Sequence, residues 1–511
     1  FGSRQSLAIA SICADLQSVH HLPMFSTIVS LFLLRAPAFV TGLTPYNPQS
    51  GWTYHLEARR VHLWPACQYR FLSYPKDCSS IDMWKFPGEN QAFSFASAGG
   101  KDFYLKAKCG TYLSYPSACD NTIIDFWPQA GVNQRFRFAG LTDLGWSLEA
   151  VGRAHCDARF IGFPERCGRR DPDPVMLRTQ AHAWHLHPAA SPLTHGRATP
   201  DSCADPYAWL AGDGTYRICC TGGDLPLWKG SGIDATSRFR TAGVLLGGSK
   251  PAWARSGHRW APENVELASG VDLAIFSAPS PHGGKHRIGW ALIMDKPESG
   301  HWTVYSPTSL DLGNDPSGEI DGHIFIDDDG ASYLVWKTDD NALGRKTTRI
   351  WAQPCDLSTN GLTLKGSRRV IMDSSGLWWI DSWVSGGTLV EGPEIVRRGK
   401  YYYLFFAAGK FCEDSYAEGV ARATDVLGPY TKLGVPLLST KMVGRGDDGK
   451  LVGPGHGSFL KDKTGEWHVM WHASEGQNCN RRAYADKLGW TADGWPYVDF
   501  STALSSAALG G

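Results

Sequence analysis

Three acidic residues each open a stretch of sequence that leads into an apolar, β-rich run. Glu391 precedes Gly392-Pro393 and, shortly afterwards, the aromatic run Tyr401 to Phe406, while Asp205 and Asp321 hold corresponding places earlier in the chain. A carboxylate is costly to hold at the inner end of a buried strand, and such groups are often kept there for chemistry. Taken alone, Glu391 could cap a surface turn. The recurrence of the stretch favours acid–base chemistry by converging carboxyl groups.

The elements that must position these acids repeat along the second part of the chain. Five stretches read as a strand, a polar turn and a second apolar strand, and they begin at Ala204, Trp260, Ile320, Val390 and Pro454. A spacing of roughly 55 to 70 residues suits four-stranded blades in radial repetition. Residues 203–503 are therefore predicted to form a five-bladed β-propeller. Its innermost strands line the axis, where the three acids would meet.

A threefold internal repeat fills residues 46–188. Its first phrase appears as CQYRFLSYPKDC, then CGTYLSYPSAC, then CDARFIGFPERC. Three copies of about forty residues, built from short strands and turns, imply pseudo-threefold symmetry. The first two copies close with a Gln-x-aromatic phrase, Gln91/Phe93 and Gln134/Phe136, while the third has His182/Trp184.

This repeat resembles the β-trefoil of ricin-type lectins and related carbohydrate-binding modules. The resemblance implies that the Gln and aromatic residues of the closing phrase belong to the core. Acids and aromatics in the loops would contact sugar, and the residues in question are Asp82, Trp84, Asp125 and Trp127.

Cysteine usage indicates an oxidising compartment. Twelve of the thirteen cysteines follow Met24, and six of them recur in the threefold repeat. We expect a disulfide within each copy, namely Cys67–Cys78, Cys109–Cys119 and Cys156–Cys167, because each pair would close a short loop. Zinc is disfavoured because no CxxC pair accompanies these residues. The pairing of the other six is open: Cys203, Cys219, Cys220, Cys355, Cys412 and Cys479.

The first 45 residues are expected to lie outside the folded domains. The apolar run Phe25 to Leu34 is too short for a membrane span and is typical of a secretory signal, followed by small residues. Met24 is the expected start, and the mature protein would begin near residues 41–46. Residues 189–202, rich in Pro, Ala, His and Ser, would be a linker, and residues 504–511 a tail.

Composition narrows the classes of partner. The formal net charge is zero and the charged residues are dispersed, so neither nucleic acid nor an anionic membrane is an expected partner. Twenty-one Trp and 57 Gly, with few helical periodicities, indicate an all-β protein with many tight turns. Abundant Trp also suits sugar binding, and we expect a monomer.

The propeller segment resembles glycoside hydrolase family 43 over nearly all of residues 203–500. The resemblance rests on Ala204-Asp205-Pro206, Trp260-Ala261-Pro262-Glu263, Ile320-Asp321, Asp328-Asp329-Gly330, Glu391-Gly392-Pro393, Gly453-Pro454-Gly455-His456 and Thr491-Ala492-Asp493-Gly494-Trp495-Pro496. Two departures are the Gly322-His323 pair after Asp321, where Pro is common in the family, and the Ile-Cys-Cys run after Asp205. Neither removes a carboxylate.

Family 43 enzymes are inverting glycosidases that act mostly on polymers of arabinose and xylose. The resemblance implies that Asp205 is the general base, Asp321 the residue that tunes the acid, and Glu391 the general acid. Inverting hydrolysis needs two carboxyl groups about 6.5–9.5 Å apart, with room for a water molecule. The acid must be protonated while the base stays ionised, and a third carboxylate near the acid raises its pKa.

Four further residues are expected to bind substrate. Trp260, Glu263 and His456 open their stretches beside the axis, and Arg482 matches a basic position over the sugar in similar enzymes. Arg482 could equally be a solvated surface residue. His456 is also a candidate ligand for a central ion, often calcium in similar enzymes, although calcium prefers oxygen ligands. No cofactor is required.

The sequence thus predicts a secreted, exo-acting α-L-arabinofuranosidase or β-xylosidase, with a trefoil that keeps it near its polysaccharide. Alternatives within the enzymes are an exo-β-1,3-galactanase or an endo-arabinanase, which loops would distinguish. A different class, a lectin-like protein without catalysis, is disfavoured because all three acids are present.

Overall fold

The computed structural model describes residues 53–58, 71–84, 92–99, 102–119, 121–142, 145–153, 155–162, 175–178, 184–190, 193–247, 250–255, 258–267, 270–281, 285–294, 302–345, 347–377, 389–476, 478–491, 494–500 and 504–505. The expected signal segment and start at Met24 lie outside these ranges, as do Cys67 and Cys167. Strands dominate the described residues, and the helices among them are single turns such as α3 (Thr440–Val443). None of these helices has the length and apolar character needed to cross a bilayer.

The N-terminal strands form one twelve-stranded antiparallel sheet system. Its strands are β1 (Thr53–Ala58), β2 (Phe71–Ser73), β3 (Asp82–Trp84), β4 (Ala92–Gly99), β5 (Asp102–Ala107), β6 (Tyr112–Ser114), β7 (Asp125–Trp127), β8 (Arg135–Thr142), β9 (Gly145–Ala150), β10 (Phe160–Gly162), β11 (Met176–Arg178) and β12 (Trp184–Ala190). The sequence repeat has a structural counterpart, because the first and second phrases of each copy pair as β2–β3, β6–β7 and β10–β11. Alternate residues, among them Phe93, Phe136 and Trp184, are fully buried in a shared core.

The predicted disulfides within single repeats are wrong. Cys78 pairs with Cys109 and Cys119 with Cys156, so each bond links one copy to the next. The physical reason is the strand inside each copy. Cys109 and Cys119 lie on either side of β6 (Tyr112–Ser114), and the extended strand between them separates the two cysteines. The end of one copy instead meets the start of the following one.

Residues from Tyr207 onward form five antiparallel sheets, each with its strands in chain order. The first blade contains β14 (Tyr207–Leu210), β15 (Tyr216–Cys219), β16 (Pro226–Gly230) and β17 (Arg240–Val244), and the second contains β18 (Trp260–Glu266), β19 (Asp272–Pro279), β20 (His286–Met294) and β21 (Trp302–Tyr305). The third contains β22 (Glu319–Ile326), β23 (Ser332–Thr338), β24 (Arg349–Ser358), β25 (Gly361–Leu364) and β26 (Arg369–Asp373), and the fourth contains β27 (Val390–Arg398), β28 (Tyr401–Ala408), β29 (Ala417–Ala423), β30 (Thr431–Lys432) and β31 (Leu438–Ser439). The fifth contains β32 (Leu451–Lys461), β33 (Trp467–Glu475), β34 (Arg481–Trp490) and β35 (Pro496–Asp499).

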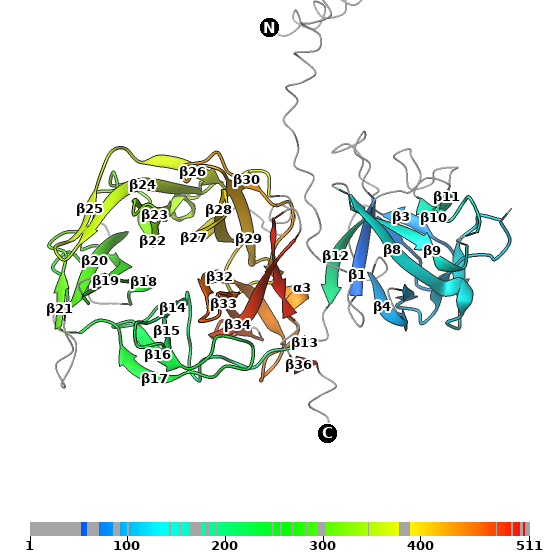
Figure 1. The fold of residues 1–511 in the computed structure, drawn as a ribbon, viewed down its shortest axis with the longest axis horizontal. Coiled ribbons are helices and arrows are strands. Elements are labelled where there is room, and N and C mark those ends of the chain that lie inside the picture. The colour runs from blue at the N-terminus through cyan, green and yellow to red at the C-terminus, as the bar shows by residue number, and fades with distance from the viewer. Residues whose placement is uncertain are drawn as a thin grey trace, which may run out of the picture. The chain divides into compact units, whose positions relative to one another are not determined.

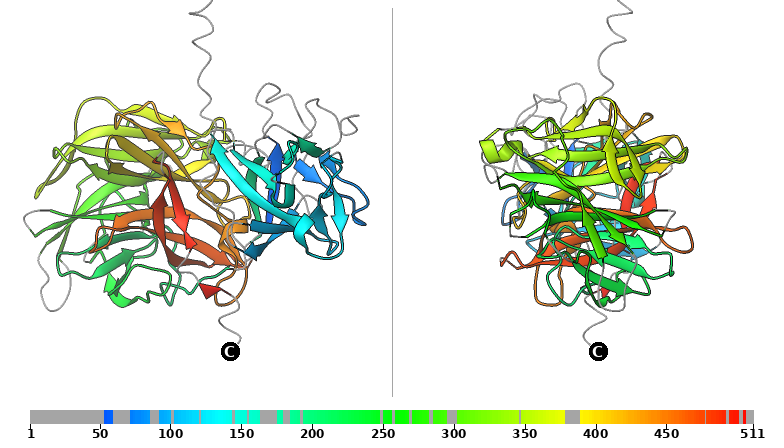
Figure 2. Two further views of the ribbon diagram at one scale, coloured as in Figure 1. Left: turned by 45° about the vertical axis from the view of Figure 1, so that its right-hand side comes forward. Right: turned by 90° about the vertical axis from the view of Figure 1, so that its left-hand side faces the viewer.

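These sheets are the blades of a five-bladed β-propeller. They follow one another around a ring from green through yellow to red, with β14, β18, β22, β27 and β32 innermost (Figure 1). The rotated views show each blade as a twisted sheet (Figure 2). In every blade the first and second strands are joined by a tight turn whose glycine has a positive φ: Gly214, Gly270, Gly330, Gly399 and Gly465. Asp327-Asp328-Asp329-Gly330 is accordingly a hairpin turn, closed by the Gly330 N–H on the Asp327 carbonyl.

The ring is closed by contacts between its first and last blades. Cys203 N donates to the Arg481 carbonyl and Ala198 N to the Ala483 carbonyl. Within the stretch expected to be a linker, β13 (Leu193–Thr194) pairs with β36 (Leu504–Ser505), beyond the predicted propeller end. A disulfide joins Cys203 to Cys220 inside the first blade.

Candidate active site

The inner strands of all five blades kink at equivalent positions. The kinked residues have positive φ angles, and they are Asp205 (51°), Ala261 (41°), Asp321 (55°), Gly392 (54°) and His456 (49°). In four blades the kink coincides with a break in the pairing register between the first and second strands. Non-glycine residues rarely adopt positive φ, and such strain gathers at functional sites. Bulges of this kind re-aim side chains, here toward one end of the axis.

Four of the five kinks are held by a hydrogen bond to the preceding blade of the ring. The backbone N–H donates across the blade boundary from Asp205 to His472 Nδ1, from Ala261 to Thr221 Oγ1, from Asp321 to Ser277 Oγ and from Gly392 to Asp321 Oδ2. A second set of bonds lies one step along the strands, where Ala208 N donates to Ser458 Oγ, Ile324 N to Glu263 Oε2, Ile395 N to His323 Nε2 and Phe459 N to Glu394 Oε1. The neighbouring blades thus fix the geometry of the carboxylate-bearing kinks.

Asp205 is a carboxylate surrounded by donors. Arg481 Nη1 donates to Oδ1 at 2.8 Å and Thr221 Oγ1 to Oδ2 at 2.6 Å. His456 Nδ1 lies 3.4 Å from Oδ1. Burial alone would raise the pKa of Asp205, but Arg481, His456, His472 and the Thr221 hydrogen bond outweigh it and hold that pKa well below its usual range. Asp205 is therefore ionised at any ordinary pH.

The surroundings of Asp321, which lies beside Glu391, have the opposite effect on its pKa from the surroundings of Asp205. Burial raises the pKa of Asp321 to about 6, with the nearby Glu391 and Asp205 adding to the effect and His456 and Lys337 opposing it. Asp321 Oδ2 accepts the N–H of Gly392, which directly follows Glu391. Glu391 itself is bound at both oxygens, by Lys337 Nζ on Oε2 at 3.1 Å and by Tyr416 Oη on Oε1 at 2.8 Å.

These three acids face one cavity of about 470 Å³, a volume in the range of small-ligand sites. Its wall combines charged groups with two exposed aromatic side chains, Trp260 and Phe411. Trp260 stacks on His286 with ring centroids 3.6 Å apart, and the Arg481 guanidinium lies over Phe411. The remaining lining residues are Thr221, Ile320, Lys337, Asp339, Asn341, Gly344, Arg345, Leu389, Gly409, Lys410 and His456.

Two of the expected substrate-binding residues lie elsewhere. Glu263 is buried and spans the second and third blades, accepting from His323 Nδ1 and Ile324 N instead of lining the cavity. Arg482 donates to the Pro200 carbonyl, whereas its neighbour Arg481 lines the cavity. Successive side chains of a strand point to opposite faces, so a choice between adjacent arginines depends on a register that sequence does not give.

Sequence reasoning missed Lys337, Tyr416, Thr221 and Arg481. All four lie on or beside the second or third strand of a blade, whereas the acids that drew attention stand near the start of the first strand. The usable signal was the lysine that directly follows the apolar run Tyr333 to Trp336, because a buried lysine needs a charged partner.

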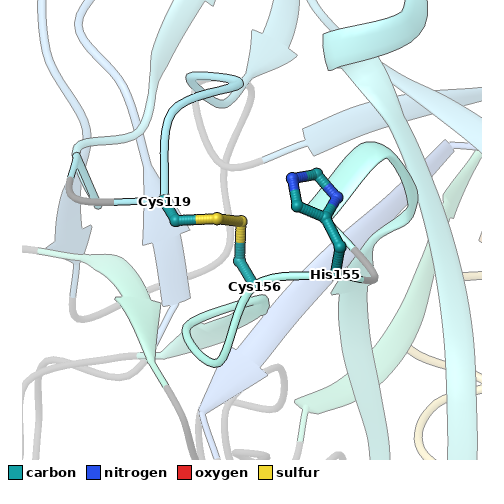
Figure 3. A group of neighbouring side chains, drawn as sticks. All are labelled: Cys119, His155 and Cys156. Atoms are coloured by element: carbon teal, nitrogen blue, oxygen red, sulfur yellow. A yellow bond between two sulfur atoms is a disulfide. The ribbon is translucent and has the colours of Figure 1, made fainter.

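The possible central ion beside His456 stays a prediction. Among the described residues, three His, Cys, Asp or Glu ligand atoms come together at Cys119, His155 and Cys156 (Figure 3), and there the two sulfurs form a disulfide that leaves no thiolate. Below His456 at the axis, a cavity of about 30 Å³ has room for one water molecule.

Removal of the Glu263 carboxylate is expected to destabilise the propeller. In Glu263→Ala the buried Ile324 N–H and the His323 ring lose their acceptor, and each unpaired buried group costs about 1–3 kcal/mol. Urea denaturation measures the loss. Glu466→Ala, at an exposed turn of the last blade, serves as the control and should change stability by less than about 0.5 kcal/mol. Equal stabilities would contradict the bracing role.

The Cys412–Cys479 disulfide is expected to support substrate binding. It links the loop that carries Phe411 to the loop just before Arg481, and these two side chains touch at the cavity wall. In the double variant Cys412→Ser/Cys479→Ser, KM should rise several-fold with a smaller change in kcat, because the positioned wall becomes mobile. Steady-state kinetics measures this. Cys78→Ser/Cys109→Ser, which opens a distant disulfide, should leave KM unchanged, and equal effects of the two would refute the idea.

A five-bladed propeller whose axial cavity pairs an ionised carboxylate with a carboxyl group of raised pKa is the framework of an acid–base hydrolase. Residues 199–496 match the family described as Glycosyl hydrolases family 43. The chain therefore belongs to glycosyl hydrolase family 43 and is a glycoside hydrolase.

Named relatives match part of this chain at moderate identity. "Probable arabinan endo-1,5-alpha-L-arabinosidase A" of Emericella nidulans is 27% identical over 334 residues, covering 60% of this chain and 95% of the relative. "Extracellular exo-alpha-(1->5)-L-arabinofuranosidase ArbA" of Cellvibrio japonicus is 28% identical over 276 residues, covering 49% and 75%. "Xylosidase/arabinosidase" of Butyrivibrio fibrisolvens is 26% identical over 216 residues, covering 41% and 38%.

Proposed function

We propose that this chain hydrolyses arabinose- or xylose-containing polysaccharide with inversion at the anomeric carbon, using Asp205 as base, Glu391 as acid and Asp321 as the residue that tunes the acid. One observation carries the proposal. The environments of the carboxyl groups push their pKa values apart, downward for Asp205 through Arg481 and upward for Asp321 beside Glu391. An ionised carboxylate suits the base, and a carboxyl group of raised pKa beside Glu391 suits the residue that tunes the acid.

The mechanism follows from these charge states. A water molecule attacks the anomeric carbon and gives a proton to Asp205, whose oxygens are fixed by Arg481 and Thr221. The bond to the leaving oxygen breaks, its electron pair stays on that oxygen, and Glu391 supplies the proton. Asp321, whose pKa is raised by burial and by the neighbouring Glu391, keeps a proton available beside the acid.

The substrate class is supported by the cavity and the relatives. Trp260 and Phe411 offer flat apolar rings at its rim, which suit sugar faces. Arabinose appears in the names of all three relatives, once as an endo-arabinanase and once as an exo-arabinofuranosidase. An α-L-arabinofuranosidase is therefore our first choice, a β-xylosidase the second and an endo-arabinanase the alternative within the family.

The test is a screen of the full chain on aryl α-L-arabinofuranoside, aryl β-D-xyloside, arabinan and β-1,3-galactan. We expect release of arabinose or xylose, with proton NMR of the first product showing the inverted anomer. Activity on β-1,3-galactan alone would replace the substrate class by the galactanase alternative. Retained configuration would contradict the roles of Asp205 and Glu391, and binding without hydrolysis would support the lectin-like alternative.

The N-terminal repeats have a proposed role of their own. We infer that residues 46–188 form a β-trefoil that keeps the enzyme near its polymer. Three equivalent hairpins support this, and Trp127 in the second copy is 54% exposed next to the exposed Asp125. The side chains of Asp82 and Trp84 lie outside the described residues. The disulfides favour secretion, and a monomer remains the expected state.

A further inference from the structure

Lys337 is a buried cation in a cavity lined by acids. Its side chain is 1% exposed, with Nζ 3.1 Å from Glu391 Oε2 and 3.3 Å from Asp339 Oδ1. It lies on β23 opposite Ile320, so it also neighbours Asp321 across the strand pair. Lysine is almost never fully buried unless it is paired. The residue therefore holds a defined charge at a defined place beside the proposed acid.

The charge of Lys337 survives burial. Burial lowers the pKa of Lys337, but Glu391, Asp339 and Asp321 outweigh that effect and raise it above its ordinary value. A buried ion pair is weak evidence for a stabilising role, since desolvation offsets much of the attraction. A fixed positive charge in contact with a proton donor, by contrast, makes it easier for that donor to give up its proton.

The two oxygens of Glu391 are held by unlike partners. Lysine has three donors and no acceptor, so Oε2 must act as an acceptor toward Lys337. The Tyr416 hydroxyl on Oε1 can either donate or accept. A proton on Glu391 can therefore reside on Oε1 while the Lys337 contact is kept.

We propose that Lys337 is a positioning residue that fixes Glu391 through Oε2, leaves Oε1 as the proton-donating atom, and sets the upper pH limit of hydrolysis through its charge. This inference rests on the proposed function. Other charged or titratable groups facing the pair are Asp321 from β22, Asp339 after β23, and Tyr416 before β29. Asp205, His456 and Arg481 line the same cavity.

The sign of the expected effect follows from the acid's proton. Activity falls at high pH when the acid pair loses that proton, and a neighbouring cation favours the loss. Removing the cation should move the alkaline limb of the profile to higher pH, by about 1–3 units for a charge at this distance. When Asp339 is neutralised, its negative charge no longer offsets the positive charge of Lys337 at Glu391. The alkaline limb of the pH profile should therefore move to lower pH.

The experiment compares kcat/KM against pH for the wild type, Lys337→Met, Lys337→Arg and Asp339→Asn on one aryl glycoside. We expect an upward shift for Met, a limb close to that of the wild type for Arg, and a downward shift for Asn. A Met variant that loses activity equally at every pH, with an unmoved limb, would show a merely structural role and overturn the inference.

Two further outcomes separate misfolding and a wrong proposed function from failure of this inference. If Lys337→Met does not fold, as judged by circular dichroism, Asp339→Asn carries the test, and an unmoved limb there overturns the inference as well. A wild-type chain without hydrolysis would instead defeat the proposed function, so the two failures are distinguishable.

Discussion

Asp205→Asn is expected to reduce kcat/KM by about 10²–10⁴ on every substrate, the usual contribution of a positioned general base. Asparagine keeps the shape of the side chain but does not take a proton from water. Water must be activated whatever the leaving group, so the losses on aryl glycosides and on natural oligosaccharides should be alike. Steady-state kinetics on both kinds of substrate measures them.

The matched control for this variant is Asp213→Asn. Asp213 lies in the exposed turn of the same blade, where it binds Arg217 and Lys229 far along the strand from the cavity. Its replacement should leave turnover unchanged. Because Asp205→Asn leaves the Arg481 guanidinium without its carboxylate, thermal unfolding must show that the variant is folded. A folded Asp205→Asn enzyme with wild-type turnover would remove Asp205 from the base role.

The propeller could be predicted from sequence because its repeat is periodic. Five opening stretches and five turn glycines report the same unit, and the symmetry of a ring then brings residues far apart in the chain to one axis. Asp205 and Asp321 occupy the same kinked position in two blades. In a third blade Glu391 stands one residue before the kinked position. The symmetry of the ring therefore predicts that Glu391 lies near the two aspartates at the axis.

The failures have the opposite cause, since they concern contacts that the repeat does not encode. Lys337 on a second strand and Tyr416 just before a third strand both reach Glu391, and these partners are not marked by the repeated acids. The same limit explains the choice of Arg482 over Arg481. Sequence spacing also does not show which cysteines meet, since Cys109 and Cys119 each pair with a neighbouring copy.

Glu391→Gln is expected to show a loss that depends on the leaving group. Glutamine retains an acceptor oxygen for Lys337 but has no proton to give the departing oxygen. On natural oligosaccharides, whose leaving groups are poor, kcat/KM should fall by about 10²–10⁴. The leaving group of an activated aryl glycoside departs without protonation, so the loss in kcat/KM on that substrate should be clearly smaller. The ratio of the two losses, from parallel kinetics, is the measured quantity.

This ratio separates acid catalysis from other ways of losing activity. Misfolding, or displacement of the Lys337 ammonium, would lower the rates on both substrates together, as Asp205→Asn also should. Glu466→Gln, at an exposed turn of the last blade, is the control and should leave both rates unchanged. A leaving-group-independent loss in a folded Glu391→Gln enzyme would contradict the acid role, because proton donation is the one step whose importance falls as the leaving group improves.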